Sequence, residues 1–97
     1  MARSIKWSPR AKKRYQQVLD YLQENWGDRV VQKFIERTDK VLYTIAAYPY
    51  AYEASSEKII RKAVIGKQNS VIYRIDNTSI YLLTFWDNRQ DPKKLKY

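Results

Sequence analysis

Basic and aromatic residues gather in the last third of the chain, on three segments that have strand character and on the residues that follow them. The residues with binding or catalytic potential are Arg61, Lys62, Arg74, Tyr81, Asp87, Arg89, Lys93 and Lys94. Arginines grouped around one point can bind a phosphate and stabilise the charge that develops when an RNA backbone is cleaved. The sequence therefore predicts a site for an anionic target at this end of the sheet.

Two of these arginines are expected to face each other across neighbouring strands. If residues 66–69 form a four-residue hairpin loop, Arg61 lies opposite Arg74, and Lys62 lies opposite Tyr73. Like charges in directly opposed positions cost roughly 0.2–1 kcal/mol, so such a pair favours a bound anion. The expectation depends on the register, because a slip of one residue moves every side chain to the other face.

The same register divides the side chains between the two faces of the sheet. On the helix-packed face it places Ile60, Val64, Val71, Tyr73, Ile75, Ile80, Leu82 and Trp86. On the arginine face it places Tyr81, Phe85 and Asp87. Plain structural roles remain open for the same residues, since Asp87 can form a surface ion pair with Arg74 or Arg89 and Trp86 can fill the core. The lysines after the last strand and the basic face of the first helix can equally be solvated surface.

The composition limits the chemistry further. The chain has 97 residues, a net charge of +9, and no cysteine or histidine. A single domain over residues 1–97 is expected at this length. Disulfides, thiol catalysis, an imidazole base and the usual zinc sites are excluded, so we expect no metal and no cofactor. No signal peptide or stretch of ~20 apolar residues is present, which predicts a soluble cytoplasmic protein without a membrane partner.

Periodicity places the elements that carry these residues. Residues 2–7 alternate as a short strand, and Ser8 and Pro9 then begin a helix whose apolar stripe runs from Ala11 to Trp26. Gly27 suits a left-handed helix stop, and Asp28 is expected to cap a second helix that ends at Tyr48-Pro49. Residues 50–58 read as a loop, and the period then changes to two over residues 59–65, 70–75 and 79–86. The layout β-α-α-β-β-β predicts an α+β domain with a helical hairpin on a sheet.

This order of elements and several motifs resemble the RelE/ParE superfamily of bacterial type II toxins. The matching segments are IKWSPRAKKRY, YLQENWGDRVVQKFIERTDKVLYTIAAYP, IIRKAVIGKQNSVIYRID and IYLLTFWDNRQDP. The resemblance implies a curved antiparallel sheet with the helical hairpin on one face. It also implies a growth-inhibiting toxin that forms a hetero-oligomer with a cognate acidic antitoxin, normally encoded beside it.

The superfamily divides by target, and the residues can be compared with each branch. RelE-like members are metal-independent endoribonucleases that cut messenger RNA on the ribosome, whereas ParE-like members bind and poison DNA gyrase. Arg61 and Arg89 match basic positions of the nucleases. Ser70 and Ala63 stand where that branch has basic residues, and the histidine of some nucleases has no counterpart. The resemblance therefore favours the ParE-like branch.

Three alternatives stay open at this point, and one of them is a degenerate toxin that is kept only as an antitoxin-binding or structural partner. An mRNA interferase would use Arg61, Arg74 and Arg89 around the scissile phosphate, with Tyr97 as a late tyrosine at an imperfect spacing. A basic RNA- or DNA-binding module without toxicity would instead stack bases on Tyr81 and Phe85, and its binding would weaken strongly with salt.

Overall fold

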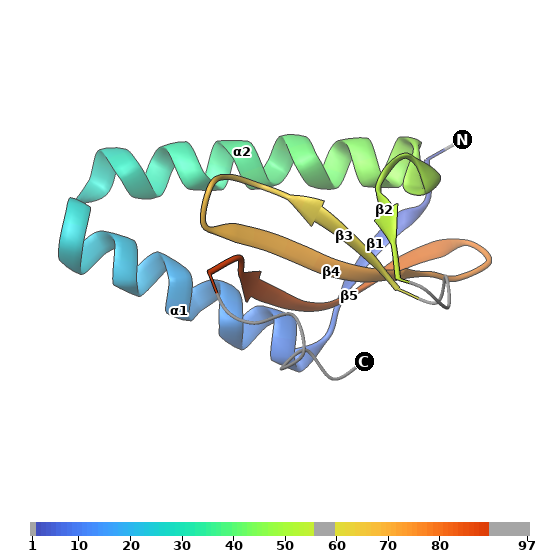
Figure 1. The fold of residues 1–97 in the computed structure, drawn as a ribbon, viewed down its shortest axis with the longest axis horizontal. Coiled ribbons are helices and arrows are strands. Elements are labelled where there is room, and N and C mark those ends of the chain that lie inside the picture. The colour runs from blue at the N-terminus through green and yellow to red at the C-terminus, as the bar shows by residue number, and fades with distance from the viewer. Residues whose placement is uncertain (1, 56–59, 90–97) are drawn as a thin grey trace.

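The computed structural model describes residues 2–55 and 60–89, which form two helices and five strands (Figure 1). The elements are β1 (Ser4–Trp7), α1 (Pro9–Trp26), α2 (Asp28–Ala47), the 3-10 helix η1 (Pro49–Ala51), β2 (Glu53–Ala54), β3 (Arg61–Val64), β4 (Asn69–Ile75) and β5 (Ser79–Asp87). The predicted α+β class, with a helical hairpin packed on a sheet, is confirmed. Lys93, Lys94 and Tyr97 lie outside the described residues.

The strands form one sheet in the order β1-β5-β4-β3-β2. The pairs β2–β3, β3–β4 and β4–β5 are antiparallel, as expected. β1 instead runs parallel to β5, with Ser4 opposite Ser79 and Trp7 opposite Leu82, so the sheet is mixed. The two-residue strand β2 and all but the first residue of the short helix η1 fall within residues 50–58, which were expected to be a loop.

Ser8 fixes the start of α1 and ties it to the last strand. Its hydroxyl accepts a hydrogen bond from the N–H of Ala11 at 3.0 Å, which confirms the predicted capping. The same hydroxyl donates to the carbonyl of Leu83 at 2.9 Å, and the Ser8 N–H donates to the carbonyl of Leu82 at 3.1 Å. The buried Ser8 thus forms hydrogen bonds both with the first turn of α1 and with β5, and these bonds fix the direction in which α1 leaves the sheet.

The turn between the helices needs a glycine. Gly27 has φ +90°, and its N–H donates to the carbonyl of Leu22 at 3.1 Å, so the predicted helix stop is confirmed. Asp28 does not cap α2 as expected, because it is already the first helical residue and α2 has no side-chain cap. Its negative charge in the first turn instead complements the positive end of the helix dipole.

The core lies between the helical hairpin and one face of the sheet. An aromatic cluster forms its centre, in which Tyr15 contacts Trp7, Phe34 and Phe85 with ring centroids 5.0–5.9 Å apart. Trp26 was expected on the buried stripe of α1, yet it is 66% exposed. It is the last residue of its helix, beyond the part of the sheet that could cover it.

The β3–β4 hairpin has a different register from the one expected. Val64 lies opposite Ser70, Lys62 opposite Ile72, and Arg61 opposite Tyr73 rather than Arg74. The pairing is shifted by one residue because the N–H groups of residues 65 and 66 both bond to the carbonyl of residue 69, so the loop closes across residues 65 and 69 instead of 65 and 70. The predicted Arg61–Arg74 pair is therefore wrong, and the helix side of β3 carries Ala63 and Ile65 while Val64 is 57% exposed.

A β-bulge in β5 changes the faces of its last residues. Tyr73 pairs with Leu82 and Ile72 pairs with Thr84, which leaves Leu83 as the extra residue. Up to Leu82 the predicted faces are correct, but beyond the bulge the alternation is reversed. The remaining assignments on β5 are corrected accordingly: Phe85 and Asp87 lie on the helix side, and Trp86 lies on the opposite face with Tyr81.

Candidate groove between α1 and β5

Arg61 lies on the helix side of the sheet, where it contacts the segment around η1. Its Nη1 donates to the carbonyl of Tyr52 at 2.7 Å and to that of Tyr50 at 3.3 Å. Its guanidinium also lies over the ring of Tyr50, 5.1 Å from the centroid. With these contacts Arg61 holds η1 and the chain after it against β3.

Arg74 lies on the opposite face of the sheet, where it pairs with Tyr81 across the β4–β5 ladder. The Arg74 guanidinium lies 5.1 Å from the centroid of the Tyr81 ring, a cation–π contact. Its Nε donates to Asp76 at 3.2 Å. Lys62 is half-buried on the same face. The exposed Arg74 and the half-buried Tyr81 thus form one unit close to the β4–β5 turn.

Arg89 and Asp87 lie at the other end of β5, where Asp87 pairs with Asn69. The Arg89 guanidinium binds both carboxylate oxygens of Asp87, with Nε–Oδ1 and Nη2–Oδ2 distances of 3.0 and 2.8 Å. The Arg89 N–H also donates to Oδ1 at 2.9 Å. The hydrogen bonds from Arg89 lower the pKa of Asp87, which therefore carries its charge throughout the neutral range. The sequence allowed Asp87 to form an ion pair with Arg74 or with Arg89, and the structure contains the pair with Arg89.

The three arginines therefore do not converge on one point. Arg61 is on the helix side, whereas Arg74 and Arg89 belong to opposite ends of the β4–β5 ladder. Ala63 and Ser70, at the positions where the nucleases carry basic residues, are completely buried. Among residues 2–55 and 60–89, no group of three or more carboxylate, histidine or cysteine side chains could hold a metal ion.

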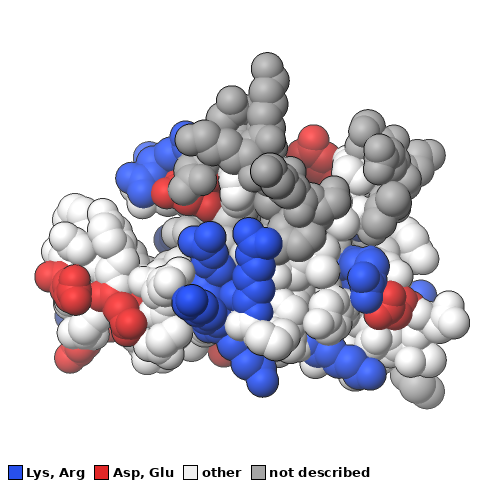
Figure 2. Space-filling model, turned by 90° about the horizontal axis from the view of Figure 1, so that it is seen from below, with Lys and Arg blue, Asp and Glu red and all other residues white. Residues whose placement is uncertain are grey.

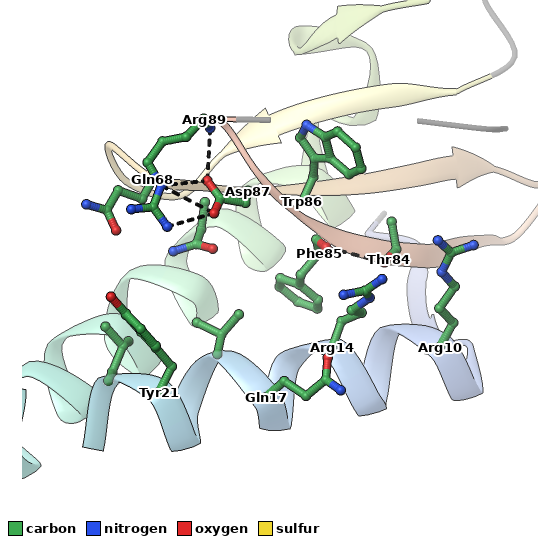
Figure 3. Close-up of a pocket in the computed structure, with 13 residues that line it drawn as sticks. Arg10, Arg14, Gln17, Tyr21, Gln68, Thr84, Phe85, Trp86, Asp87 and Arg89 are labelled. Atoms are coloured by element: carbon green, nitrogen blue, oxygen red, sulfur yellow. Dashed lines mark hydrogen bonds and ion pairs between the residues drawn. The ribbon is translucent and has the colours of Figure 1, made fainter. Parts of the chain in front are cut away.

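A groove that the sequence did not predict runs between α1 and the last part of β5. We call it the α1–β5 groove; it encloses a cavity of about 230 Å³. It is lined by Arg10, Arg14, Gln17, Val18, Tyr21, Leu22, Gln68, Asn69, Thr84, Phe85, Trp86, Asp87 and Arg89. Figure 3 shows Arg10 and Arg14 rising from α1 toward β5, with Arg89 and Asp87 at the far end.

The helix that forms one wall of this groove presents a basic surface. Seen from below Figure 1, on the side where α1 lies, Lys and Arg side chains gather at the centre and acidic ones lie toward the sides (Figure 2). Arg10, Lys13, Arg14 and Gln17 line a second, shallow hollow on this helix. Positions 10, 14 and 21 share one helical face, so their side chains line the same wall of the groove.

The fold agrees with the comparisons to known proteins. The model of the family described as "ParE toxin of type II toxin-antitoxin system, parDE" matches residues 5–92. No curated protein sequence matches the chain. Because the family match spans almost the whole chain, the class is that of the type II toxins, and the chain belongs to the ParE toxin family.

Solved structures show the same fold at low sequence identity. The chromosomal ParDE system of P. aeruginosa matches with a TM-score of 0.74 and 17% identity, over 89% of this chain and 96% of that one. The YoeB dimer of Staphylococcus aureus gives 0.63 and 17%, over 89% and 97% of the two chains. The DinJ–YafQ toxin–antitoxin complex of E. coli gives 0.60 and 13%, over 90% and 93%. None of the helices among the described residues is long and apolar enough to cross a membrane.

Proposed function

We propose that this chain is a toxin that arrests growth by binding DNA gyrase and that a cognate antitoxin neutralises it. The observation that carries the choice of target is the separation of Arg61, Arg74 and Arg89 on the sheet. A ribonuclease that works without a metal needs several basic groups around one phosphate, to stabilise its charge and to move protons. The three candidate arginines do not supply such a centre, which supports a toxin that acts by binding.

We assign the target-binding surface to the two ends of β5. We propose that Arg89 and Asp87, with Lys93 and Lys94 after them in sequence, form one part of the target-binding surface. Arg74 with its stacked Tyr81 forms another, and Lys62 lies on the same face. We do not include Arg61 in this surface, because its guanidinium donates to the carbonyls of Tyr50 and Tyr52.

Cells that express the chain for a short time test this proposal. Incorporation of labelled thymidine and labelled leucine is followed in parallel after induction. A gyrase toxin lowers thymidine incorporation first, while leucine incorporation continues. Leucine incorporation that collapses within minutes would instead indicate an mRNA interferase. Unchanged growth, together with salt-sensitive binding of RNA by the purified chain, would indicate a nucleic-acid-binding module.

The antitoxin is tested in the same cells. Co-expression of the protein encoded beside the chain should restore growth, since solved relatives include toxin–antitoxin complexes such as DinJ–YafQ. Arg89→Ala is expected to weaken the arrest, because it removes an exposed cation at the strand exit. Lys40→Ala, on the exposed surface of α2, serves as the matched control.

A further inference from the structure

A separate hollow lies between α2 and the turn of residues 66–69, which joins β3 to β4 and runs beside α2 in Figure 1. We call it the α2–turn hollow; it has a volume of about 310 Å³. Its apolar lining consists of Leu22, Val30 and Phe34. Its other lining residues belong to the turn or are cations of α2, so the hollow has an apolar part and a strongly polar rim.

Three cations from two different elements form this rim. Lys33 and Arg37 come from α2, and Lys67 comes from the turn. No acidic residue is among the described residues that line the hollow. Asp28 and Glu36 lie on the other side of Lys33, where they line a neighbouring hollow of the same helix. The α2–turn hollow therefore attracts an anion.

The protein does not neutralise these cations itself. Among the described residues, the ion pairs join Arg74 to Asp76 and Arg89 to Asp87, and neither includes a cation of the hollow. The side chains of Lys33, Arg37 and Lys67 are exposed. They lie next to an apolar lining, where the attraction between charges is screened less than in open water. A ligand can thus supply the missing negative charge.

The turn is fixed before any ligand binds. The Asn88 side chain donates to the carbonyls of Gly66 and Lys67, both at 3.4 Å, and the Asn88 N–H donates to that of Gln68 at 2.8 Å. Each of these carbonyls therefore has a donor already. The guanidinium of Arg37 lies beside Gly66, since a Cβ built on this glycine would be 3.5 Å from Nη1. The cations of helix and turn are thereby held close together.

The polar groups of the hollow are those that bind phosphates of DNA. Lysine and arginine side chains, together with the amides of Gln68 and Asn69, are typical donors to phosphate oxygens. Lys33 and Arg37 lie one helical turn apart, ~6 Å along the axis, so that they can reach neighbouring phosphates of one strand. Lysine is depleted at protein–protein interfaces, which favours a nucleic acid over an acidic protein. The net charge of +9 supports the same choice.

The hollow adjoins the surface assigned to the target. Gln68 and Asn69 line both the α2–turn hollow and the α1–β5 groove, whose far end carries Arg89 and Asp87 (Figure 3). A partner held at Arg89 therefore lies next to the hollow. Any DNA that this partner carries can reach the three cations.

We propose that the α2–turn hollow binds the phosphate backbone of duplex DNA, with Lys33, Arg37 and Lys67 each contacting a phosphate. The choice of DNA rests on the proposed function, because DNA is the substrate of gyrase. The toxin then holds two ligands side by side, the enzyme at the end of β5 and the DNA between α2 and the turn. The contact is independent of base sequence, since phosphates carry none of it.

Binding of a labelled DNA duplex of about 20 base pairs to the purified full-length chain tests the proposal. Fluorescence anisotropy gives the affinity between about 50 and 200 mM salt. Lys33→Ala, Arg37→Ala and Lys67→Ala should each weaken binding and reduce the slope of log affinity against log salt by about 1, because each variant loses one phosphate contact. Lys12→Ala removes the same charge from an exposed position of α1 outside the hollow, and it should leave the slope nearly unchanged. Thermal melts show that each variant keeps the fold.

The contrary results are equally specific. A duplex that does not bind at about 50 mM salt would overturn the proposal, and so would a slope that changes as much in Lys12→Ala as in Lys67→Ala. An RNA duplex of the same length should bind no more tightly than the DNA. RNA bound at least about tenfold more tightly, with the same dependence on Lys67, would overturn the proposal in favour of RNA. Polyglutamate of equal charge that binds more tightly than the DNA would overturn it in favour of an acidic protein.

The outcome is separable from that of the toxin assay, because the binding experiment contains neither gyrase nor cells. A chain that binds DNA through the hollow without arresting growth contradicts the proposed function and supports the hollow. A chain that stops thymidine incorporation, with the salt slope unchanged in Lys67→Ala, overturns the hollow alone.

Discussion

Arg61 and Tyr73 lie directly opposite each other across the β3–β4 ladder, and both bind the segment around η1. The hydroxyl of Tyr73 donates to the carbonyl of Pro49 at 2.6 Å, while the Arg61 guanidinium donates to the carbonyls of Tyr50 and Tyr52. Two neighbouring strands thereby hold the point where the chain leaves α2 and enters the sheet. Both side chains therefore support the fold at this point.

Replacing Arg61 is therefore expected to destabilise the fold. Arg61→Ala removes charge-assisted hydrogen bonds to two carbonyls, which should lower the free energy of unfolding by about 2 kcal/mol. Arg74→Ala, which loses an exposed ion pair, should change it by less than about 1 kcal/mol. Urea denaturation of the two variants measures the difference. Equal stabilities would contradict the structural role of Arg61.

Tyr73 should make the protein sensitive to alkaline pH. Burial raises the pKa of its hydroxyl from 10.0 to about 12. Below pH 10 the hydroxyl is neutral in both states, so its contribution to stability is complete. Between pH 10 and 12 the unfolded tyrosine ionises while the folded one stays protonated, and the free energy of unfolding falls by up to about 3 kcal/mol.

The comparison with Tyr73→Phe isolates this effect, because lysines and other tyrosines titrate in both proteins. Unfolding by urea is measured at pH 9.5 and 11.5. The drop between these values should be smaller in the variant, although the variant starts from a lower stability without the bond to Pro49. The same drop in both proteins would show that Tyr73 is not protected from ionisation.

Of the two serines near the start of the chain, Ser8 should be the one whose replacement by alanine lowers the free energy of unfolding more. Ser8→Ala removes the cap of α1 and leaves the carbonyl of Leu83 without its side-chain donor. A loss of about 1–2 kcal/mol is expected from the cap alone. Ser4→Ala, at an exposed position of β1, is the control and should be nearly neutral. If Ser8→Ala were as stable as Ser4→Ala, the Ser8 side chain would not stabilise the start of α1 as described.

The Asp87–Arg89 pair can be tested by titration. The pKa of the Asp87 carboxyl should lie below its ordinary value and return toward it in Arg89→Ala, because the hydrogen bonds from Arg89 cause the lowering. Carboxyl chemical shifts followed by NMR from pH 2 to 6 give both values. The stability that the pair contributes is present above the ordinary pKa and is lost as the pH falls through the lowered one.

The sequence predicted the helices and strands better than it predicted the face of the sheet on which each strand residue lies. Ser8 and Gly27 are local signals, and both helix boundaries that they predict are confirmed, as are the class and the layers. The faces failed at two points where a single residue changes the parity of a strand. One is the loop that closes across residues 65 and 69, which moves Arg61 opposite Tyr73, and the other is the bulge at Leu83. Neither the loop closure nor the bulge can be recognised from the alternation of apolar residues in the sequence.

The groove was missed for a related reason. Arg10 and Arg14 look like ordinary solvated residues of an amphipathic helix, as many such residues are. Their position becomes informative only once β1 is known to end at Trp7 and to leave the edge of β5 open beside them. That depends on the lengths of two strands far apart in sequence, which periodicity does not determine.

Purified components test the central proposal most directly. DNA gyrase is incubated with relaxed plasmid, ATP and increasing amounts of the chain, and supercoiling and cleaved DNA are measured on gels. In parallel, translating ribosomes with a defined messenger RNA receive the same amounts, and the RNA is mapped by primer extension. The account predicts inhibited supercoiling with intact messenger RNA. Cleaved messenger RNA with unaffected gyrase would contradict it.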